Sequence, residues 1–90
     1  MNRALYYTNA FTRDMKRISK QYKDLSILEY VIERLLKKSI LPTKFCDHKL
    51  SGKYKGSREC HVFPDLLLVY DNSAQDKLIL QRLGSHSELF

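Results

Sequence analysis

The feature that most constrains the fold is the run from Leu66 to Tyr70, in which every residue is apolar. Successive side chains of a β-strand point to opposite faces of the sheet, so this strand would be apolar on both faces. Such a strand belongs at the centre of a sheet rather than at its edge. We therefore expect a central strand here, covered on one side by helices.

Two further strand candidates flank this run, at 57–63 and 78–83. The turn-rich segment 71–76 separates the central run from the last candidate, which favours antiparallel neighbours. A short β-prone stretch, 4–8, begins the chain. No internal repeat or linker interrupts the sequence.

Two helices are expected before the sheet. Thr8 or Asn9 can cap the first, whose apolar residues recur at helical spacing, and its opposite face carries Arg13, Lys16, Arg17 and Lys20, which we interpret as a mainly solvated face. A second helix should begin near Asp24 or Ser26, with a capping box from Ser26 to Glu29, and run to about Lys38. The two would form a hairpin with one apolar side.

The segment that follows, from Pro42 to Gly56, loses periodicity and is predicted to be an exposed loop. Gly52 and Gly56 flank a short stretch that is basic and aromatic, Lys53-Tyr54-Lys55. Lysines beside an aromatic ring suit contacts with phosphates and stacked bases.

Length and charge narrow the functional classes. Ninety residues predict a single domain over 1–90. Sixteen Lys and Arg against ten Asp and Glu give a net charge of +6, which favours polyanionic partners such as nucleic acid. The first residues lack the pattern of a signal peptide, and no apolar run is long enough for a membrane span. We therefore expect a cytoplasmic protein with reduced cysteines.

The three histidines lie in short polar segments of the C-terminal half: His48, His61 and His86. Alternation places His61 with Glu59 on one face of the 57–63 strand, and Arg58 on the other. Pro64 ends that strand and can bring Asp65 near His61. Because histidine titrates near neutral pH, such a group predicts an acid–base centre beside bound phosphate.

The sequence resembles the RelE/ParE superfamily of bacterial toxins, and within it the YafQ-like messenger RNA interferases. The resemblance rests on the segments 47–65 (DHKLSGKYKGSRECHVFPD) and 82–90 (RLGSHSELF) and spans nearly the whole chain. It implies an α+β fold in which a twisted antiparallel sheet packs against an N-terminal two-helix hairpin and leaves a basic concave face for RNA. It also implies a toxin that cleaves mRNA on the ribosome and is silenced by a cognate antitoxin.

The resemblance assigns catalytic positions to His48, His61, Asp65 and His86. RNA-binding positions are expected at Lys49, Lys53, Lys55, Arg58, Arg82 and Phe90. One departure is Leu66, where the subfamily often has tryptophan, which predicts a different substrate preference.

The chemistry that suits these groups is attack by the ribose 2′-hydroxyl on the adjacent phosphorus, with no metal or other cofactor. It leaves a 2′,3′-cyclic phosphate and a 5′-hydroxyl. We expect His86 to act as general acid, Asp65 or His48 as base, and His61 to orient or neutralise. Arg82, and Arg58 if it is not a structural ion-pair partner, would stabilise charge.

Three other interpretations are weaker. A zinc site from Cys46, His48, Cys60 and His61 has poor spacing, because the last two are adjacent on a strand and point to opposite faces. A gyrase-inhibiting toxin of the ParE type would share the fold without needing a ribonuclease centre. A simple nucleic-acid-binding module would leave the histidine and aspartate set unexplained.

Overall fold

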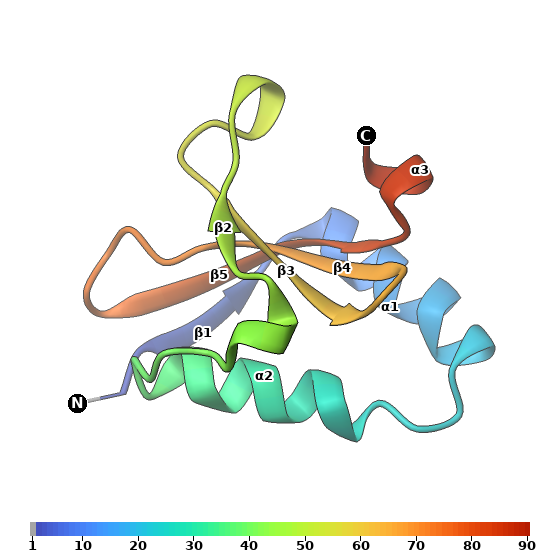
Figure 1. Cartoon of the computed structure of the whole chain (residues 1–90), viewed down its shortest axis with the longest axis horizontal. Helices are drawn as coiled ribbons and strands as arrows, with labels where there is room; N and C mark the ends of the chain where they lie inside the picture. The colour runs from blue at the N-terminus through green and yellow to red at the C-terminus, as the bar shows by residue number, and fades with distance from the viewer. Residues whose placement is uncertain (1) are drawn as a thin grey trace.

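The structure, a computed structural model, describes residues 2–90. It is an α+β fold in which a sheet is packed against helices, as the sequence predicts (Figure 1). In chain order the elements are β1 (Ala4–Tyr7), α1 (Asn9–Gln21), α2 (Ser26–Leu36), η1 (Thr43–Phe45), β2 (His48–Lys49), η2 (Gly52–Tyr54), β3 (Arg58–Phe63), β4 (Leu66–Asp71), β5 (Lys77–Gly84) and α3 (His86–Leu89).

The five strands lie in the order β1-β5-β4-β3-β2. Strands β2 to β5 pair antiparallel, whereas β1 joins β5 in parallel, so the sheet is mixed at one edge. The predicted central strand is β4, and residues 66–70 are all buried. β4 is therefore apolar on both faces because both of its faces are buried, as expected for a central strand.

The two N-terminal helices begin in different ways. Thr8 caps α1 as predicted, since its side-chain oxygen accepts a hydrogen bond from the backbone N–H of Phe11 at 3.0 Å. The predicted capping box of α2 is wrong: Ser26 is already the first helical residue, and Leu25 at the cap position makes no side-chain hydrogen bond. Asp24 instead accepts a hydrogen bond from the Ser26 N–H at 2.9 Å.

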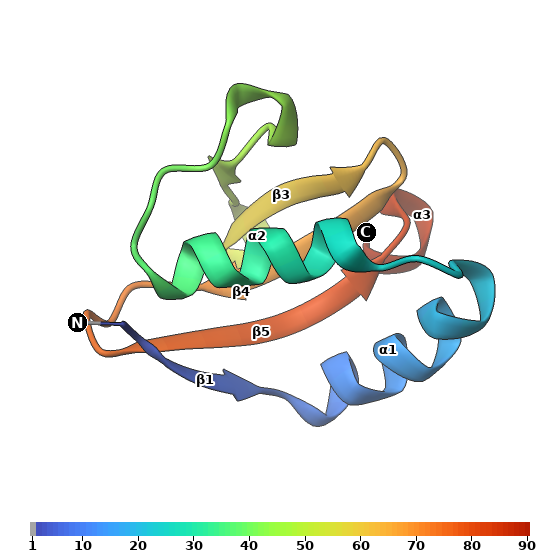
Figure 2. The same cartoon turned by 90° about the horizontal axis from the view of Figure 1, so that it is seen from below.

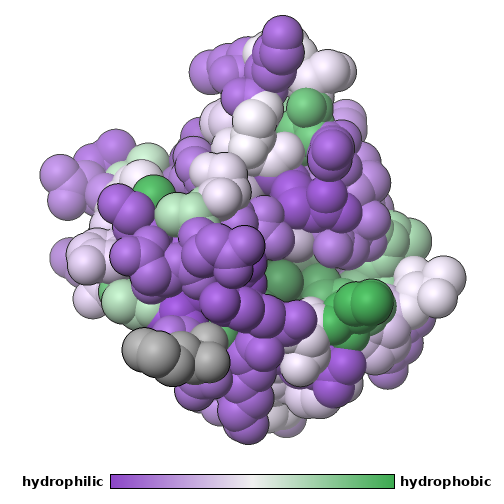
Figure 3. Space-filling model, turned by 90° about the vertical axis from the view of Figure 1, so that its left-hand side faces the viewer, coloured by the Kyte–Doolittle hydropathy of each residue, from purple (hydrophilic) through white to green (hydrophobic). Residues whose placement is uncertain are grey.

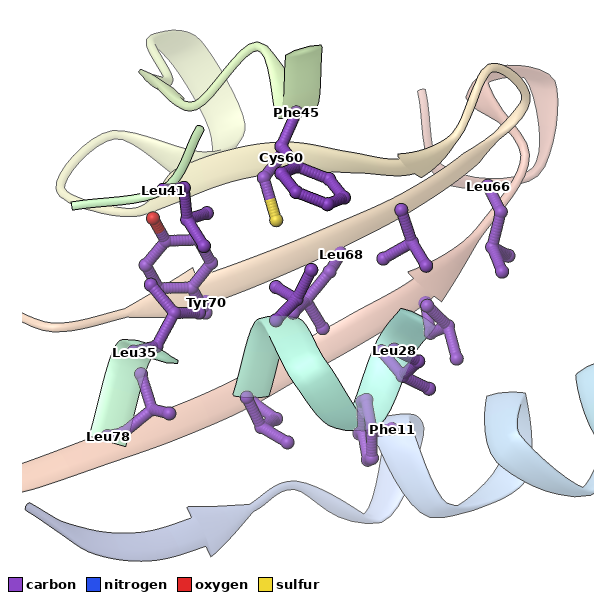
Figure 4. Close-up of a cluster of buried hydrophobic side chains, with 14 of the residues drawn as sticks. Phe11, Leu28, Leu35, Leu41, Phe45, Cys60, Leu66, Leu68, Tyr70 and Leu78 are labelled. Carbon is purple, nitrogen blue, oxygen red and sulfur yellow. The ribbon is translucent and has the colours of Figure 1, made fainter. Parts of the chain in front are cut away.

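The main core fills the space between one face of the sheet and the two helices (Figures 2 and 4). Phe11 from α1 and Leu28 and Leu35 from α2 pack against Cys60, Leu68 and other inward side chains of the strands. The helical apolar stripes predicted from the sequence are thus core rather than binding surface.

The segment 42–56 is more ordered than predicted. Phe45 in η1 is buried in the main core, and His48 and Lys49 form an edge strand paired with Glu59 and Arg58. A strand of two residues has no periodicity to detect, so the sequence could not reveal it.

The face of the molecule seen in Figure 3 is mostly hydrophilic, with smaller hydrophobic areas. The large hydrophobic side chains that are exposed are Leu5, Tyr6, Tyr7, Tyr30, Ile40 and Phe90. Within residues 2–90, no helix is long and apolar enough to cross a membrane.

Candidate active site

We call the sheet face turned away from α2 the site face. The arm, residues 50–57 with η2, and the C-terminal helix α3 both rise on this side, and we call the region between them the basin (Figure 1). Leu67 and Val69 of β4 form the floor, where they pack with Leu89 of α3 and with Leu50 and Tyr54 of the arm. A second, smaller apolar cluster therefore fixes both walls of the basin.

Strand register brings the histidine segments onto this floor. His48 pairs with Glu59, Glu59 with Val69, and Val69 with Arg82, so these residues form one row across the sheet. His61 pairs with Leu67, and Leu67 with Gly84, two residues before His86. Since strands lie about 4.8 Å apart, the backbones at His61 and Gly84 are about 10 Å apart.

His48 and His61 gather around the carboxylate of Glu59. The Nε2 atom of His48 lies 3.0 Å from Glu59 Oε2, and that of His61 lies 3.9 Å from the same oxygen. The two imidazole rings have centroids 6.4 Å apart. The predicted pairing of His61 with Glu59 on one face is confirmed, although the sequence assigned Glu59 no role.

Both ring nitrogens of His48 face acceptors. Nδ1 lies 2.7 Å from the carbonyl oxygen of Cys46, and Nε2 faces the Glu59 carboxylate. A carbonyl and a carboxylate can only accept, so both contacts are hydrogen bonds only when the ring carries two protons. Because both ring nitrogens are engaged, neither is free to take a proton from a substrate, which suits a positioning role better than proton abstraction.

Glu59 is only 5% exposed, and its Oε1 atom has no hydrogen-bond partner among the described residues. A buried carboxylate oxygen without a hydrogen-bond partner lowers the stability of the fold, so its presence calls for a functional reason such as holding the neighbouring histidines. Alternation along β3 was the signal that could have identified Glu59, because it places this residue beside His61. Its burial depends on β2, which the sequence did not reveal.

His86 is the first residue of α3 and is exposed. Ser85 and Glu88 form a capping box that starts this single helical turn. The backbone N–H of His86 also lies 3.5 Å from Asp65 Oδ1, so the turn after β3 and the start of α3 are neighbours. Asp65, which the sequence placed near His61, is thus also a neighbour of the His86 backbone at the end of the sheet.

Phe90 and Tyr54 close the basin above His86. The ring of Phe90 lies 5.2 Å from that of His86 and 5.5 Å from that of Tyr54, which it meets edge-on. Phe90 is 51% exposed, so part of its ring stays open to solvent. Lys53 lies over the Tyr54 ring at 5.6 Å, which places one predicted RNA-binding lysine on the same wall.

Arg82 is held by a buried carboxylate from α1. Asp14 is 2% exposed and accepts hydrogen bonds from Arg82 Nε at 2.8 Å and from the Leu83 N–H at 2.9 Å. Burial alone would raise the pKa of Asp14, but the hydrogen bonds from Arg82, Leu83 and Arg17 lower it below the usual value. The same pair raises the pKa of Arg82. Arg82 is therefore a fixed cation at the β5 end of the row that runs from His48 across the sheet.

Arg17 links this carboxylate to the C-terminal helix. Its Nη1 lies 3.1 Å from Asp14 Oδ1, its Nη2 donates to the carbonyl of Leu83 at 3.1 Å, and its Nε lies 3.0 Å from Glu88 Oε2. The sequence placed Arg17 on a solvated basic face, which is wrong for this residue. Asp14 lies at helical spacing from Arg17, but the contacts with Leu83 and Glu88 join elements far apart in sequence, and helical spacing gave no signal for them.

Other predicted RNA-binding residues are not gathered on the site face. Lys49 pairs with Arg58, and Arg58 pairs with the core residue Tyr70, so both point to the opposite face. Arg58 forms an ion pair with Asp47 at 3.2 Å. Lys55 is exposed beside η2 on the arm.

Two sequence arguments concern residues that the structure buries. Leu66, which stands where the subfamily often has tryptophan, is 1% exposed and belongs to the main core on the helix side. Cys60 also lies in that core, on the face opposite His61. The four side chains of the zinc hypothesis therefore do not converge.

Comparison with known proteins identifies similar chains. The family model described as the bacterial toxin of type II toxin-antitoxin system, YafQ, matches residues 3–90. The mRNA interferase toxin YafQ of Escherichia coli K12 is 36% identical over 92 residues, covering 100% of this chain and 98% of that protein. A copper-bound mutant toxin from Helicobacter pylori superimposes with a TM-score of 0.90 at 47% identity, covering 100% of both chains. YafQ in the E. coli DinJ-YafQ complex superimposes with a TM-score of 0.87 at 35% identity, covering 98% of each chain.

Proposed function

The chain belongs to the YafQ family of bacterial toxins from type II toxin–antitoxin systems, and we propose on this basis that it is an endoribonuclease that cleaves messenger RNA. The observation that carries the proposal is that His48 and His61 lie together on the site face, while His86 follows the end of β5 on the same side of the sheet. The net charge of +6 favours RNA as the ligand of that face. Translated mRNA bound to the ribosome is the proposed substrate, which places the activity in the cytoplasm.

The proposed reaction is attack of the ribose 2′-hydroxyl on the neighbouring phosphorus, with departure of the 5′-oxygen. His86 acts as general acid, because it is exposed and stands on the opposite side of the basin from the Glu59 cluster. The separation of about 10 Å between the backbones at His61 and Gly84 leaves room for a phosphodiester between the imidazoles.

Acid and base must flank the phosphorus in such an in-line reaction. Asp65 lies beside His86, so it is better placed to orient the acid than to abstract a proton from the other side. Both ring nitrogens of His48 are engaged, one by the Cys46 carbonyl and the other by the Glu59 carboxylate, so His48 is poorly placed to abstract a proton. We therefore favour His61 as base, with Asp65 as the alternative, and Arg82 as the fixed cation that stabilises the phosphorane charge.

A cognate antitoxin is the proposed protein partner, because the E. coli relatives are described in DinJ-YafQ complexes. An acidic segment that folds over the basic basin would block access of RNA to His86.

The test is cleavage of a defined mRNA, with and without ribosomes, by wild type and by a folded His86→Ala variant. We expect the wild type to leave a 2′,3′-cyclic phosphate and the variant to lose 10²–10⁴-fold in rate, roughly the contribution of one general acid. An RNA with a 5′-thiolate leaving group needs no acid, so it should restore most of the variant's rate. Absence of cleavage by the wild type under every condition would refute the proposal.

The same assay with EDTA addresses metal dependence, since a similar H. pylori toxin is described as copper-bound. Acid–base chemistry by side chains predicts an unchanged rate. A rate that falls with EDTA and returns with one added metal would contradict this part of the proposal.

A further inference from the structure

A groove runs along the outer edge of β3, next to the histidine cluster but outside the basin. It has a volume of about 490 Å³ and lies between residues 61–64 of β3 and its turn, residues 44–46 after η1, and Ile27 at the start of α2. We call it the β3-edge groove. It exists because β2 pairs only with Arg58 and Glu59 and leaves the rest of β3 without an outer neighbour.

The backbone of His61 faces this groove. The Leu50 N–H donates to the Ser57 carbonyl at 2.9 Å, so Ser57 directs its backbone groups toward the β2 side. Backbone groups alternate between the two sides of an antiparallel strand, which turns Glu59 and then His61 the same way. At His61 the edge strand has ended, so one N–H donor and one C=O acceptor stand side by side at the groove.

The walls of the groove are mostly apolar and carry no carboxylate. Phe45, Val62, Phe63 and Ile27 supply hydrophobic surface, and Lys44 with His61 are the lining residues that can carry positive charge. A second cavity, of about 360 Å³ between α1 and α3, is lined instead by Asp65 and Glu88, which would repel phosphate. Charge therefore favours the β3-edge groove for part of an RNA strand.

The groove is continuous with the candidate active site through His61, which lines the groove and whose imidazole belongs to the Glu59 cluster. The alternation of backbone groups along β3 turns its main chain toward the groove. An RNA strand with its phosphate between His61 and His86 would leave the basin over the β3 edge. We propose that the β3-edge groove is a nucleobase subsite that binds a base next to the scissile phosphate. This inference rests on the proposed ribonuclease function.

In this subsite the apolar walls contact the faces of the base, and the His61 N–H and C=O meet its polar edge. Adjacent donors and acceptors are what distinguishes one base from another. Lys44 pairs with the phosphate that follows. The groove would thus add sequence preference to a basin that itself contacts the sugar and phosphate.

The test blocks the groove and measures RNA binding and cleavage separately. Ile27→Trp narrows the groove, while Ile40→Trp is the matched control, because Ile40 is 88% exposed and lies outside the groove. Binding is followed with a short RNA that has a 2′-deoxy group at the cleavage site, and cleavage with the same RNA in unmodified form. Companion RNAs carry one abasic nucleotide beside that site.

One base bound in such a groove is worth about 1–3 kcal/mol, so we expect Ile27→Trp to weaken binding and raise KM by about 5- to 150-fold. The value of kcat should stay within about twofold. An RNA with an abasic nucleotide at one position should bind wild type more weakly by a similar factor. The same abasic nucleotide should cause no further loss of binding to Ile27→Trp.

A second block avoids any risk to folding. Cys46 is exposed beside the groove, whereas Cys60 is buried, so a bulky maleimide added to folded protein should attach at Cys46. This labelled protein should show the same loss of RNA binding as Ile27→Trp. Because binding is read with an uncleavable RNA, wild type that binds but does not cut would refute the nuclease proposal while still testing the subsite.

Unchanged RNA binding in both blocked proteins would overturn the subsite. So would an abasic penalty that is equally large in wild type and Ile27→Trp. If blocking instead abolishes neutralisation by the antitoxin while RNA binding is intact, the groove is a protein-docking site and the inference is wrong.

Discussion

Replacing Asp14 with asparagine should show how much of the fold depends on one buried carboxylate. Asp14 Oδ1 and Oδ2 receive both the Arg82 guanidinium and the Leu83 N–H, and Arg17 adds a third donor. Asparagine keeps the size and one acceptor for Leu83. Its NH₂ group, however, would face the N–H donors of Arg82 and Arg17. The partly buried Arg82 guanidinium would also lose the negative charge that it pairs with.

Removing one partner of a buried ion pair costs about 3–5 kcal/mol. Because the amide can still accept from Leu83, we expect the lower end for Asp14→Asn, about 3 kcal/mol at pH 7. For a domain of this size this corresponds to a fall in Tm of roughly 12–24 °C. Urea unfolding of wild type and variant measures the difference in free energy directly.

The pH dependence provides an independent check of the cause. The folded-state pKa of Asp14 lies below its usual value of 3.8, so its ionisation stabilises the fold above that pH. This contribution is lost as the pH falls through the lower folded-state pKa. The stability gap between wild type and Asp14→Asn should therefore be full at pH 7 and shrink below pH 3.8.

Glu33→Gln is the control, because Glu33 forms an exposed ion pair with Lys37 at 2.7 Å. Such an exposed pair contributes little to stability, so this variant should unfold at nearly the same urea concentration as wild type. If Asp14→Asn costs less than about 1 kcal/mol, or if its gap persists unchanged into acid, the buried network does not stabilise the fold as argued.

Three shorter predictions concern α3 and the cysteines. Arg17→Gln should lower kcat more than it raises KM, because Arg17 holds α3 through Glu88. In urea unfolding, a double-mutant cycle with Glu88→Gln should give a coupling free energy of about 0.5–1 kcal/mol, and additive effects would contradict the link. Gly84→Ala should destabilise by about 1–3 kcal/mol in urea unfolding, since its Cβ would lie 3.0 Å from Arg17 Nη2 and 3.0 Å from Glu88 Oε1; unchanged stability would refute the tight packing. A thiol reagent should modify Cys46 quickly and Cys60 only on unfolding, because burial raises the pKa of Cys60 to about 12; two fast thiols would contradict this.

Local patterns predicted the parts of the fold that depend on few residues. The apolar run at 66–70 predicted the central strand, and Thr8 predicted the start of α1, because each signal is complete within a few positions. The family resemblance and the strand ends then placed His61, Asp65 and His86 near one another. Placing these three residues near one another needed only the order of the strands and the positions of their ends.

The remaining parts depend on contacts between distant segments. Glu59 is buried and shared by two histidines only because a two-residue strand, 48–49, covers the edge of β3. Arg17 appeared to belong to a solvated helix face, yet besides Asp14 on its own helix it has partners on β5 and α3. The periodicity of residues within one helix or strand cannot predict partners that lie on other elements.

The two sides of the basin also differ in how firmly they are held. His48 is fixed on one side through both ring nitrogens, to a backbone carbonyl and to a buried carboxylate that is itself part of the sheet. His86 stands on a helix of one turn, which is anchored at its end by buried Leu89, whereas its polar contacts run through Glu88 and Asp65, both exposed. Movement on binding RNA should therefore concern α3 and Phe90, while the Glu59 cluster keeps its geometry. The fixed side is suited to holding the His61 imidazole in place, and the adjustable side to bringing a proton to the leaving oxygen.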